Sequence, residues 1–267
     1  MLKHRIITAL ILIPFVLLSI FYLPLLAFAG VSAILVLMGA WEWADLIGWK
    51  SIFKRCLYLI LLLLFLTVLL VIPTGLVLFA ALLTWLAMLY FVFRYDHFVY
   101  VWARSPWLRI TLGIWILGTT WYGLNTIQHL PDGPIYLLFL LLFIWGADTG
   151  AYFMGRRWGK HKLAPQISPG KSIEGVIGGS FVSVLIAMIG SWFFHAANGI
   201  SVNFIVLAFF ISLISVLGDL FESMIKRQAG VKDSGNLLPG HGGLLDRIDS
   251  LLSTAPLYAL WLLLFLI

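Results

Sequence analysis

Four polar residues that could perform chemistry follow one another with helical spacing late in the chain. Asp219 is followed by Glu222, Ser223 and Lys226, at steps of three, four and seven residues, so a helix places all four on one face. Asp219 lies in an otherwise apolar segment. An ionisable group inside a membrane helix costs roughly 2.5 to 3.5 kcal/mol on insertion scales and marks a functional site by default. We therefore interpret this face as functional.

A second pair of acids, Asp246 and Asp249, repeats the three-residue spacing at the start of the last apolar segment, with Arg247 between them. Carboxylates on two helix ends at the same membrane depth are typical of a magnesium site, because Mg²⁺ takes one or two carboxylates and completes its shell with water and phosphate oxygens. We predict that Asp219, Asp246 and Asp249 hold Mg²⁺, with room for a second metal ion.

Ordinary salt bridges are the alternative interpretation of these acids. Pairing with neighbouring lysines and arginines accounts well for Glu222 and Asp233, but poorly for the three predicted metal ligands together. Two further acids in the first half of the chain, Glu42 and Asp45, are three residues apart at the inner end of an apolar segment. We interpret them as solvated carboxylates at a helix end.

Two glycine-rich segments of mixed charge, residues 155–174 and 223–250, could bind phosphate. Lysines and arginines beside backbone amides that glycines leave accessible form a polyphosphate cradle. Gly170, Lys171 and Ser172 resemble part of a Walker motif, but Pro165 stands where that motif needs its first glycine, and no strand is expected before it. Acidic lipid head groups are an alternative ligand for these loops.

The elements that position these residues follow from composition. Of 267 residues, 62% are hydrophobic and 10% are charged, which excludes a water-soluble globule. A helix needs about 20 apolar residues to span a bilayer. We predict an all-α polytopic integral membrane protein with about nine transmembrane helices: two in residues 6–47, two in 56–93, one each in 110–130 and 134–154, two in 175–218, and one in 251–267.

The basic residues test this topology. With the N-terminus in the cytoplasm, all 17 lysines and arginines fall in inner segments, which agrees with the positive-inside rule. We therefore expect a cytoplasmic N-terminus, a C-terminus on the outer, periplasmic side, and a site that faces the cytoplasm. Residues 1–109 are expected to form an N-terminal scaffold of about four helices, and residues 110–267 a catalytic region that carries both polar loops.

The late motifs resemble a known family. The run Ser223-Met-Ile-Lys-Arg227, then Lys232-Asp233, then Leu238-Pro-Gly-His-Gly-Gly243, then Asp246-Arg-Ile-Asp249 is similar to the signature of phosphatidate cytidylyltransferases, also called CDP-diacylglycerol synthases. The stretches 148–155 and 167–175 look like the same family, although Gly170 and Ile173 depart from its usual residues. The resemblance covers roughly residues 140–255.

The resemblance implies transfer of the cytidylyl group of CTP to phosphatidic acid with Mg²⁺, in the inner membrane of a bacterium, by a homodimer. We expect in-line attack by a phosphatidate oxygen on the α-phosphorus of CTP. No nucleic-acid partner is expected. The predicted catalytic residues are Asp219, Lys226, Arg227, Asp246 and Arg247. The predicted substrate-binding residues are Ser223, Lys232, Asp233, His241, Gly242, Gly243, Asp148, Ser168 and Lys171.

Two other functions would use similar residues. A CTP-dependent membrane lipid kinase would share the metal carboxylates and cations, but it would transfer phosphate to a hydroxyl group and release CDP instead of pyrophosphate. A transporter would also explain buried carboxylates in a helical bundle. Transporters tend to contain repeated halves with paired broken helices, whereas the two halves of this chain look unlike each other.

Overall fold

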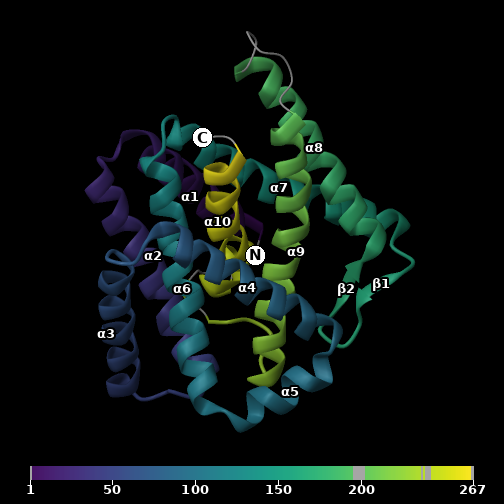
Figure 1. The fold of residues 1–267 in the computed structure, drawn as a ribbon. Coiled ribbons are helices and arrows are strands. Elements are labelled where there is room, and N and C mark those ends of the chain that lie inside the picture. The colour runs from purple at the N-terminus through teal and green to yellow at the C-terminus, as the bar shows by residue number, and fades with distance from the viewer. Residues whose placement is uncertain (1, 195–201, 236, 238–241, 266–267) are drawn as a thin grey trace.

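The computed structural model describes residues 2–194, 202–235, 237 and 242–265, and most of them are helical (Figure 1). The elements are, in chain order, α1 (Leu2–Tyr22), α2 (Leu25–Leu46), α3 (Ile52–Leu69), α4 (Thr74–Phe93), α5 (Tyr95–Arg104), α6 (Pro106–His129), α7 (Gly133–Trp158), β1 (Lys162–Ala164), β2 (Ser168–Ser172), α8 (Ile173–Phe194), α9 (Val202–Gln228) and α10 (Leu245–Phe265).

The expected apolar stretches are all helices. Seven helices in the described part of the chain are long and apolar enough to cross a membrane, namely α2, α3, α4, α7, α8, α9 and α10. The remaining two expected stretches are the helices α1 and α6, which fall outside that set. The protein is therefore an α-helical membrane protein, while the number of nine crossings and the orientation of the termini stay predictions.

Helix α5 was not expected, because residues 95–104 are too short and too polar to span a membrane. One face of this helix is buried through Phe98 and Trp102, while Asp96, Tyr100 and Arg104 are exposed. The buried rings stack on each other with centroids 5.3 Å apart, and Trp102 meets Trp43 of α2 edge to face. Such an amphipathic helix is typical of the membrane interface.

Helix α10 occupies the centre of the bundle and contacts α2, α4, α6, α7 and α9. Pro256 inside it cannot donate a hydrogen bond to the carbonyl of Leu252 one turn earlier. The hydroxyl of Thr120 on α6 lies 3.3 Å from that carbonyl oxygen and shares its proton between it and the carbonyl oxygen of Ile116, at 2.7 Å. Gly123 allows this close crossing, because a Cβ atom there would lie 2.7 Å from the backbone of Ala255.

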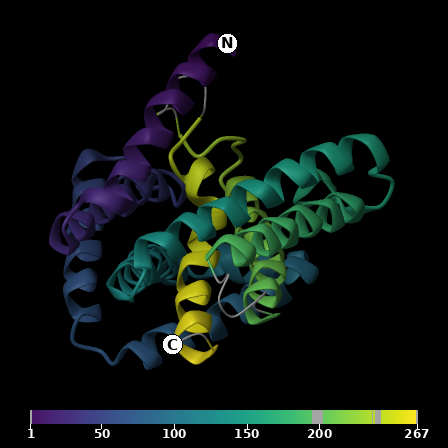
Figure 2. The ribbon, with the colours of Figure 1, turned by 90° about the horizontal axis from the view of Figure 1, so that it is seen from above.

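Helices α7 and α8 lie side by side along their length, with the β1–β2 hairpin at one end (Figure 2). Glycines make the close contact possible. A Cβ atom on Gly150 would lie 2.4 Å from the carbonyl oxygen of Gly178, and one on Gly179 would lie 2.6 Å from that of Ala147. This contact fixes the position of Asp148, which lies between the two α7 residues.

The β1–β2 hairpin is a departure from a purely helical fold. Lys162 pairs with Ser172 and Ala164 with Ser168 in an antiparallel ladder. The Ser172 hydroxyl accepts a hydrogen bond of 3.1 Å from the backbone N–H of Gly175 and so caps the start of α8. The hairpin therefore holds Lys171 at a fixed place beside the first turn of α8.

Candidate active site

The first cluster of predicted site residues lies where α7, β2 and α9 meet. Asp148, Lys171 and Asp219 line one cavity of about 470 Å³. The ammonium group of Lys171 is 2.6 Å from a carboxylate oxygen of Asp219. Ser223, one turn further along α9, donates a hydrogen bond of 3.4 Å to the other oxygen of Asp219. The structure thus brings together four residues that were predicted from two separate loops and two helices.

Asp249 belongs to the same acidic cluster. Its carboxylate interacts electrostatically with Asp219 and Asp148, and Asp148 interacts in turn with Lys171 and Arg247. The approach of α9 to α10 depends on Gly218, where a Cβ atom would lie 2.5 Å from the backbone oxygen of Asp249. Two carboxylates on crossing helices are a donor set that suits Mg²⁺.

A second cluster forms one turn further along α9. The ammonium group of Lys226 lies between two carboxylates, 2.5 Å from Glu222 and 2.6 Å from Asp246. The side chains are buried, with exposed fractions of 11%, 1% and 9%. The expected pairing of Glu222 is therefore confirmed. A buried charge pair of this kind is costly to break, because each partner left alone is an uncompensated charge.

Asp246 is fully engaged by protein donors. One oxygen accepts from the ammonium group of Lys226, and the other accepts from the backbone N–H groups of Ser234 and Gly243, at 3.0 and 2.8 Å. The Ser234 hydroxyl lies 3.1 Å from this second oxygen and shares its one proton between Asp246 and Glu42. Both oxygens of Asp219 likewise have protein partners, so the predicted metal role of Asp246 stays a prediction. The residue also fixes the loop between α9 and α10 to both helices.

Glu42 is buried, with 4% exposure, so its interpretation as a solvated helix-end acid is wrong. Its carboxylate accepts hydrogen bonds from the Ser234 hydroxyl at 2.9 Å and from the backbone N–H groups of Leu244 and Leu245, both at 2.8 Å. Those two amides stand at the start of α10, where a helix has no partners of its own for them. Glu42 of α2 therefore caps the helix that carries Asp246 and Asp249.

The glycines of the signature pack against these two carboxylates. A Cβ atom on Gly243 would lie 2.5 Å from Glu42, and one on Gly242 would lie 2.8 Å from Asp246. Gly242 also has φ +81°, a conformation that favours glycine. The backbone N–H of Gly243 is occupied by Asp246. These glycines thus bring the loop close to protein acids, and the expected role of Gly242 and Gly243 in substrate binding stays a prediction.

Arg227 holds two backbone segments together. Its guanidinium donates to the carbonyl oxygen of Ile167 in the hairpin at 3.2 Å and to that of Val231 at 3.1 Å. Ser168 lies next to this contact in β2 and is partly buried. Arg227 thus fixes the hairpin that carries Lys171 to the end of α9, and its catalytic role stays a prediction.

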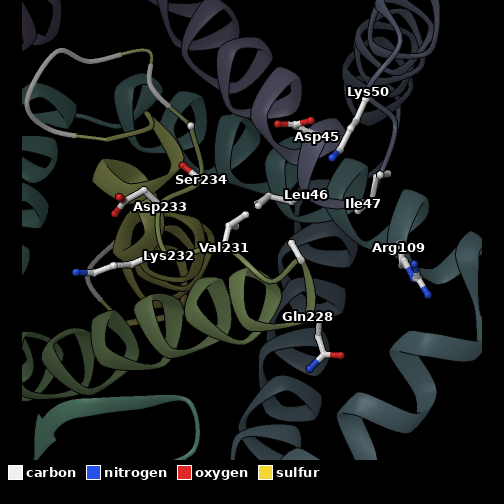
Figure 3. Close-up of a pocket in the computed structure, with 13 residues that line it drawn as sticks. Asp45, Leu46, Ile47, Lys50, Arg109, Gln228, Val231, Lys232, Asp233 and Ser234 are labelled. Atoms are coloured by element: carbon white, nitrogen blue, oxygen red, sulfur yellow. The ribbon is translucent and has the colours of Figure 1, made fainter.

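Lys232 and Asp233 line a second cavity of about 660 Å³ between the end of α2 and the loop after α9. Figure 3 shows both side chains pointing away from Asp45 and Lys50, which lie across the cavity. Both are exposed. The end of α2, the start of α6 and the end of α9 all contribute residues to this cavity. The topology that was derived from the basic residues also predicts these three helix ends on the same side of the membrane. His241 lies outside the described residues.

Comparison with known proteins decides the family. The model of the cytidylyltransferase family matches residues 3–265. The chain belongs to the cytidylyltransferase family. A phosphatidate cytidylyltransferase of Pseudomonas aeruginosa is 42% identical over 265 residues, which cover 98% of this chain and 97% of that protein. One of Haemophilus influenzae is 38% identical over 284 residues, covering 97% and 98%. One of Staphylococcus epidermidis is 48% identical over 126 residues, covering 47% and 48%.

Membership of the cytidylyltransferase family confirms the resemblance that was drawn from the signature residues, and it supports an enzyme over a transporter. Two contributors to the site, Glu42 and Arg156, were not among the predicted site residues, although Arg156 lies in the segment 155–174 that was expected to bind phosphate. The spacing of Glu42 gave no sign of its partners, which lie about 200 residues further along. Arg156 lines the cavity of Asp219, and one signal for it is its position one helical turn after Tyr152, on the face that also carries Asp148.

Proposed function

We propose that this protein is a phosphatidate cytidylyltransferase of bacterial phospholipid biosynthesis. It transfers the cytidylyl group of CTP to phosphatidate and gives CDP-diacylglycerol and pyrophosphate. The observation that carries the proposal is the acidic cluster of Asp148, Asp219 and Asp249 on membrane helices, with Lys171 held against Asp219. Relatives that match nearly the full chain bear the same activity in their names.

The proposed reaction is a direct in-line displacement. An oxygen of the phosphatidate phosphate attacks the α-phosphorus of CTP, a new P–O bond forms, and the bond from that phosphorus to the oxygen bridging to the β-phosphorus breaks. Pyrophosphate leaves with the electron pair. The attacking phosphate is already an anion at neutral pH, so the step needs no general base. The main task of the protein is to bring two polyanions together.

The acidic cluster is proposed to hold Mg²⁺ through Asp219 and Asp249. No group of three histidine, cysteine or acidic side chains suited to a metal occurs among the described residues. Two carboxylates nevertheless suffice, since Mg²⁺ fills its other positions with water and phosphate oxygens. When bound, the ion neutralises phosphate charge as it develops in the transition state. Asp148 adds negative charge to this site, which favours the cation.

The basic residues then divide the remaining work. Lys171 lies beside Asp219 and neutralises a phosphate at the metal site. Arg247 interacts electrostatically with Asp148, which belongs to the acidic cluster. Lys232 is exposed, and its role is to bind CTP as the nucleotide enters from the solvent. Lys226 holds Asp246 in place, and through it the loop that borders the site. We propose that this site faces the cytoplasm, where CTP is available, and that the protein is a homodimer of the inner membrane.

The test is incubation of the purified protein with CTP labelled at the α-phosphate, phosphatidate and Mg²⁺. The expected products are a labelled liponucleotide and an equal amount of pyrophosphate, and chelation of the metal should abolish both. Release of CDP with a phosphorylated lipid would show a kinase instead. If proteoliposomes moved a solute without consuming CTP, the enzyme proposal would fail.

A further inference from the structure

Arg156 is a second cation in the cavity that holds Asp219. It lies on α7 two turns after Asp148, and both side chains line the cavity of about 470 Å³. Its guanidinium donates a hydrogen bond of 2.8 Å to the hydroxyl of Tyr152 and lies over that ring, 5.9 Å from its centre. Tyr152 therefore contacts the guanidinium without neutralising it, and both side chains are exposed.

The two cations of this cavity differ in how they are compensated. Lys171 is paired with Asp219 at 2.6 Å, whereas Arg156 has no ion-pair partner within the described ranges. The ionisable lining as a whole consists of two acids and two bases. A planar guanidinium that contacts a neutral group and is left without an acid is well suited to bind a phosphate through two oxygens.

The surroundings of the cavity indicate which phosphate this is. Most of its other walls are small or apolar, and include Ala151, Gly175 and Val176. The two hydroxyl groups of the lining already have partners, since Tyr152 accepts from Arg156 and Ser172 accepts from the backbone N–H of Gly175. Tyr152 of the lining, its sequence neighbour Phe153, and Ile177 next to the lining residue Val176 are 57%, 65% and 60% exposed. They lie on α7 and α8, which are apolar enough to cross a membrane, so their exposed surface meets lipid and suits acyl chains.

We propose that this cavity binds the phosphate monoester of the lipid substrate, with Arg156 and Lys171 as its cationic ligands. This inference rests on the proposed function, since it divides that reaction between a lipid phosphate in this cavity and a nucleotide that enters elsewhere. Arg156 then determines recognition of a terminal phosphate, which carries close to two negative charges. Diacylglycerol, which has no phosphate, gains nothing from this residue.

The experiment measures binding and kinetics on the full-length chain in detergent micelles. Equilibrium binding of dioctanoyl phosphatidate is measured without CTP, with dioctanoyl glycerol as the lipid without phosphate. For Arg156→Ala we expect phosphatidate binding to weaken about tenfold or more, as befits a lost charge-assisted pair. We expect KM for phosphatidate to rise by the same factor, while KM for CTP stays within about twofold.

The matched control is Arg157→Ala. Arg157 has the same side chain on the next residue, but it lies over the ring of Trp158 at 5.3 Å and does not line the cavity. Its variant should bind phosphatidate as the unchanged protein does. If Arg156→Ala does not yield folded protein, Arg156→Gln removes the charge and keeps a group that can hydrogen-bond to Tyr152. It should show the same selective loss.

The outcomes separate this inference from the proposed function. If the unchanged protein makes no CDP-diacylglycerol, the proposed function is wrong. If it does, and the Arg156 variants bind phosphatidate normally, only the lipid-phosphate site is wrong. A rise in KM for CTP alone would assign the cavity to the nucleotide phosphates and would also overturn the inference. An equal loss in Arg157→Ala would show a general effect of surface charge.

Discussion

The carboxylate of Glu42 and the hydroxyl of Ser234 are 2.9 Å apart, although 192 residues separate them in the chain. The same hydroxyl is 3.1 Å from Asp246. Ser234 therefore joins an acid of the N-terminal scaffold to an acid of the signature. The N-terminal residues thus contribute to the site region, because Glu42 fixes the loop and the helix start that border the acidic cluster.

Replacement of Glu42 tests this joint. Glu42→Ala leaves the amides of Leu244 and Leu245 buried without an acceptor, and each such donor costs about 1–3 kcal/mol. We expect faster amide hydrogen exchange at the start of α10 and a large loss of turnover. Asp45→Asn is the control, because Asp45 is 42% exposed and its pairing with Arg55 resembles surface pairs worth about 0–1 kcal/mol. Equal exchange in both variants would contradict the capping role.

Asp219→Asn tests the acidic cluster. The change keeps the shape of the side chain and removes the charge that binds a cation and pairs with Lys171. We expect turnover to fall by about a hundredfold or more, as for other losses of transition-state electrostatics, with little change in unfolding temperature. The control is Asp132→Asn, which removes an acid just before α7, at the end of that helix far from Asp148. The φ of Asp132 is 57°, a conformation that asparagine also adopts readily. Near-normal turnover in Asp219→Asn would refute the metal proposal.

Lys226→Met tests the buried charge cluster. The change leaves Glu222 and Asp246 facing each other without their shared cation. Breaking a buried pair in this way costs about 3–5 kcal/mol, and we expect that loss in the free energy of unfolding in detergent. Adding Glu222→Gln to Lys226→Met should recover part of it, since one unpaired charge is removed. If the double variant were no more stable than the single one, Glu222 would not be coupled to Lys226.

Gly218→Ala tests the distance between α9 and α10. The new methyl group would lie 2.5 Å from the backbone oxygen of Asp249 and from the hydroxyl of Ser253, so the helices must separate. Overpacking of this kind costs about 1–3 kcal/mol, and the separation of Asp219 from Asp249 should lower metal affinity and turnover. Gly30→Ala is the control, because no atom lies within 4 Å of its added Cβ. It should leave both quantities unchanged.

The helices could be predicted from the sequence because long uncharged stretches must be helical in a bilayer. The polar face from Asp219 to Lys226 could also be predicted, because the spacing of residues in the sequence determines which side chains are neighbours on a helix. The structure extends α9 to Gln228 and starts α10 at Leu245, so the second polar loop is shorter than expected. Residues 223–228 and 245–250, which were assigned to the loop because of their polar composition, are helical.

The contacts between distant segments could not be predicted in this way. Asp246 and Asp249 share a spacing, yet one turns to Lys226 and the other to the cluster of Asp219. Which way each carboxylate turns depends on the crossing of α9 and α10, and that crossing depends on where Gly218 allows contact. Glu42 illustrates the same limit, because nothing near it in the chain indicates its partners.

The capping of α10 by Glu42 has a consequence for biosynthesis. Glu42 is made early, but its hydrogen-bond donors at residues 234, 244 and 245 leave the ribosome about 200 residues later. Until then a carboxylate one turn inside a membrane segment has none of its native partners, and such a group favours the water interface. The hydrogen bonds of Glu42 therefore form only after the start of the last helix has been made. A nascent chain that stops before α10 lacks Asp249 and therefore lacks the acidic cluster that we propose to hold the metal ion.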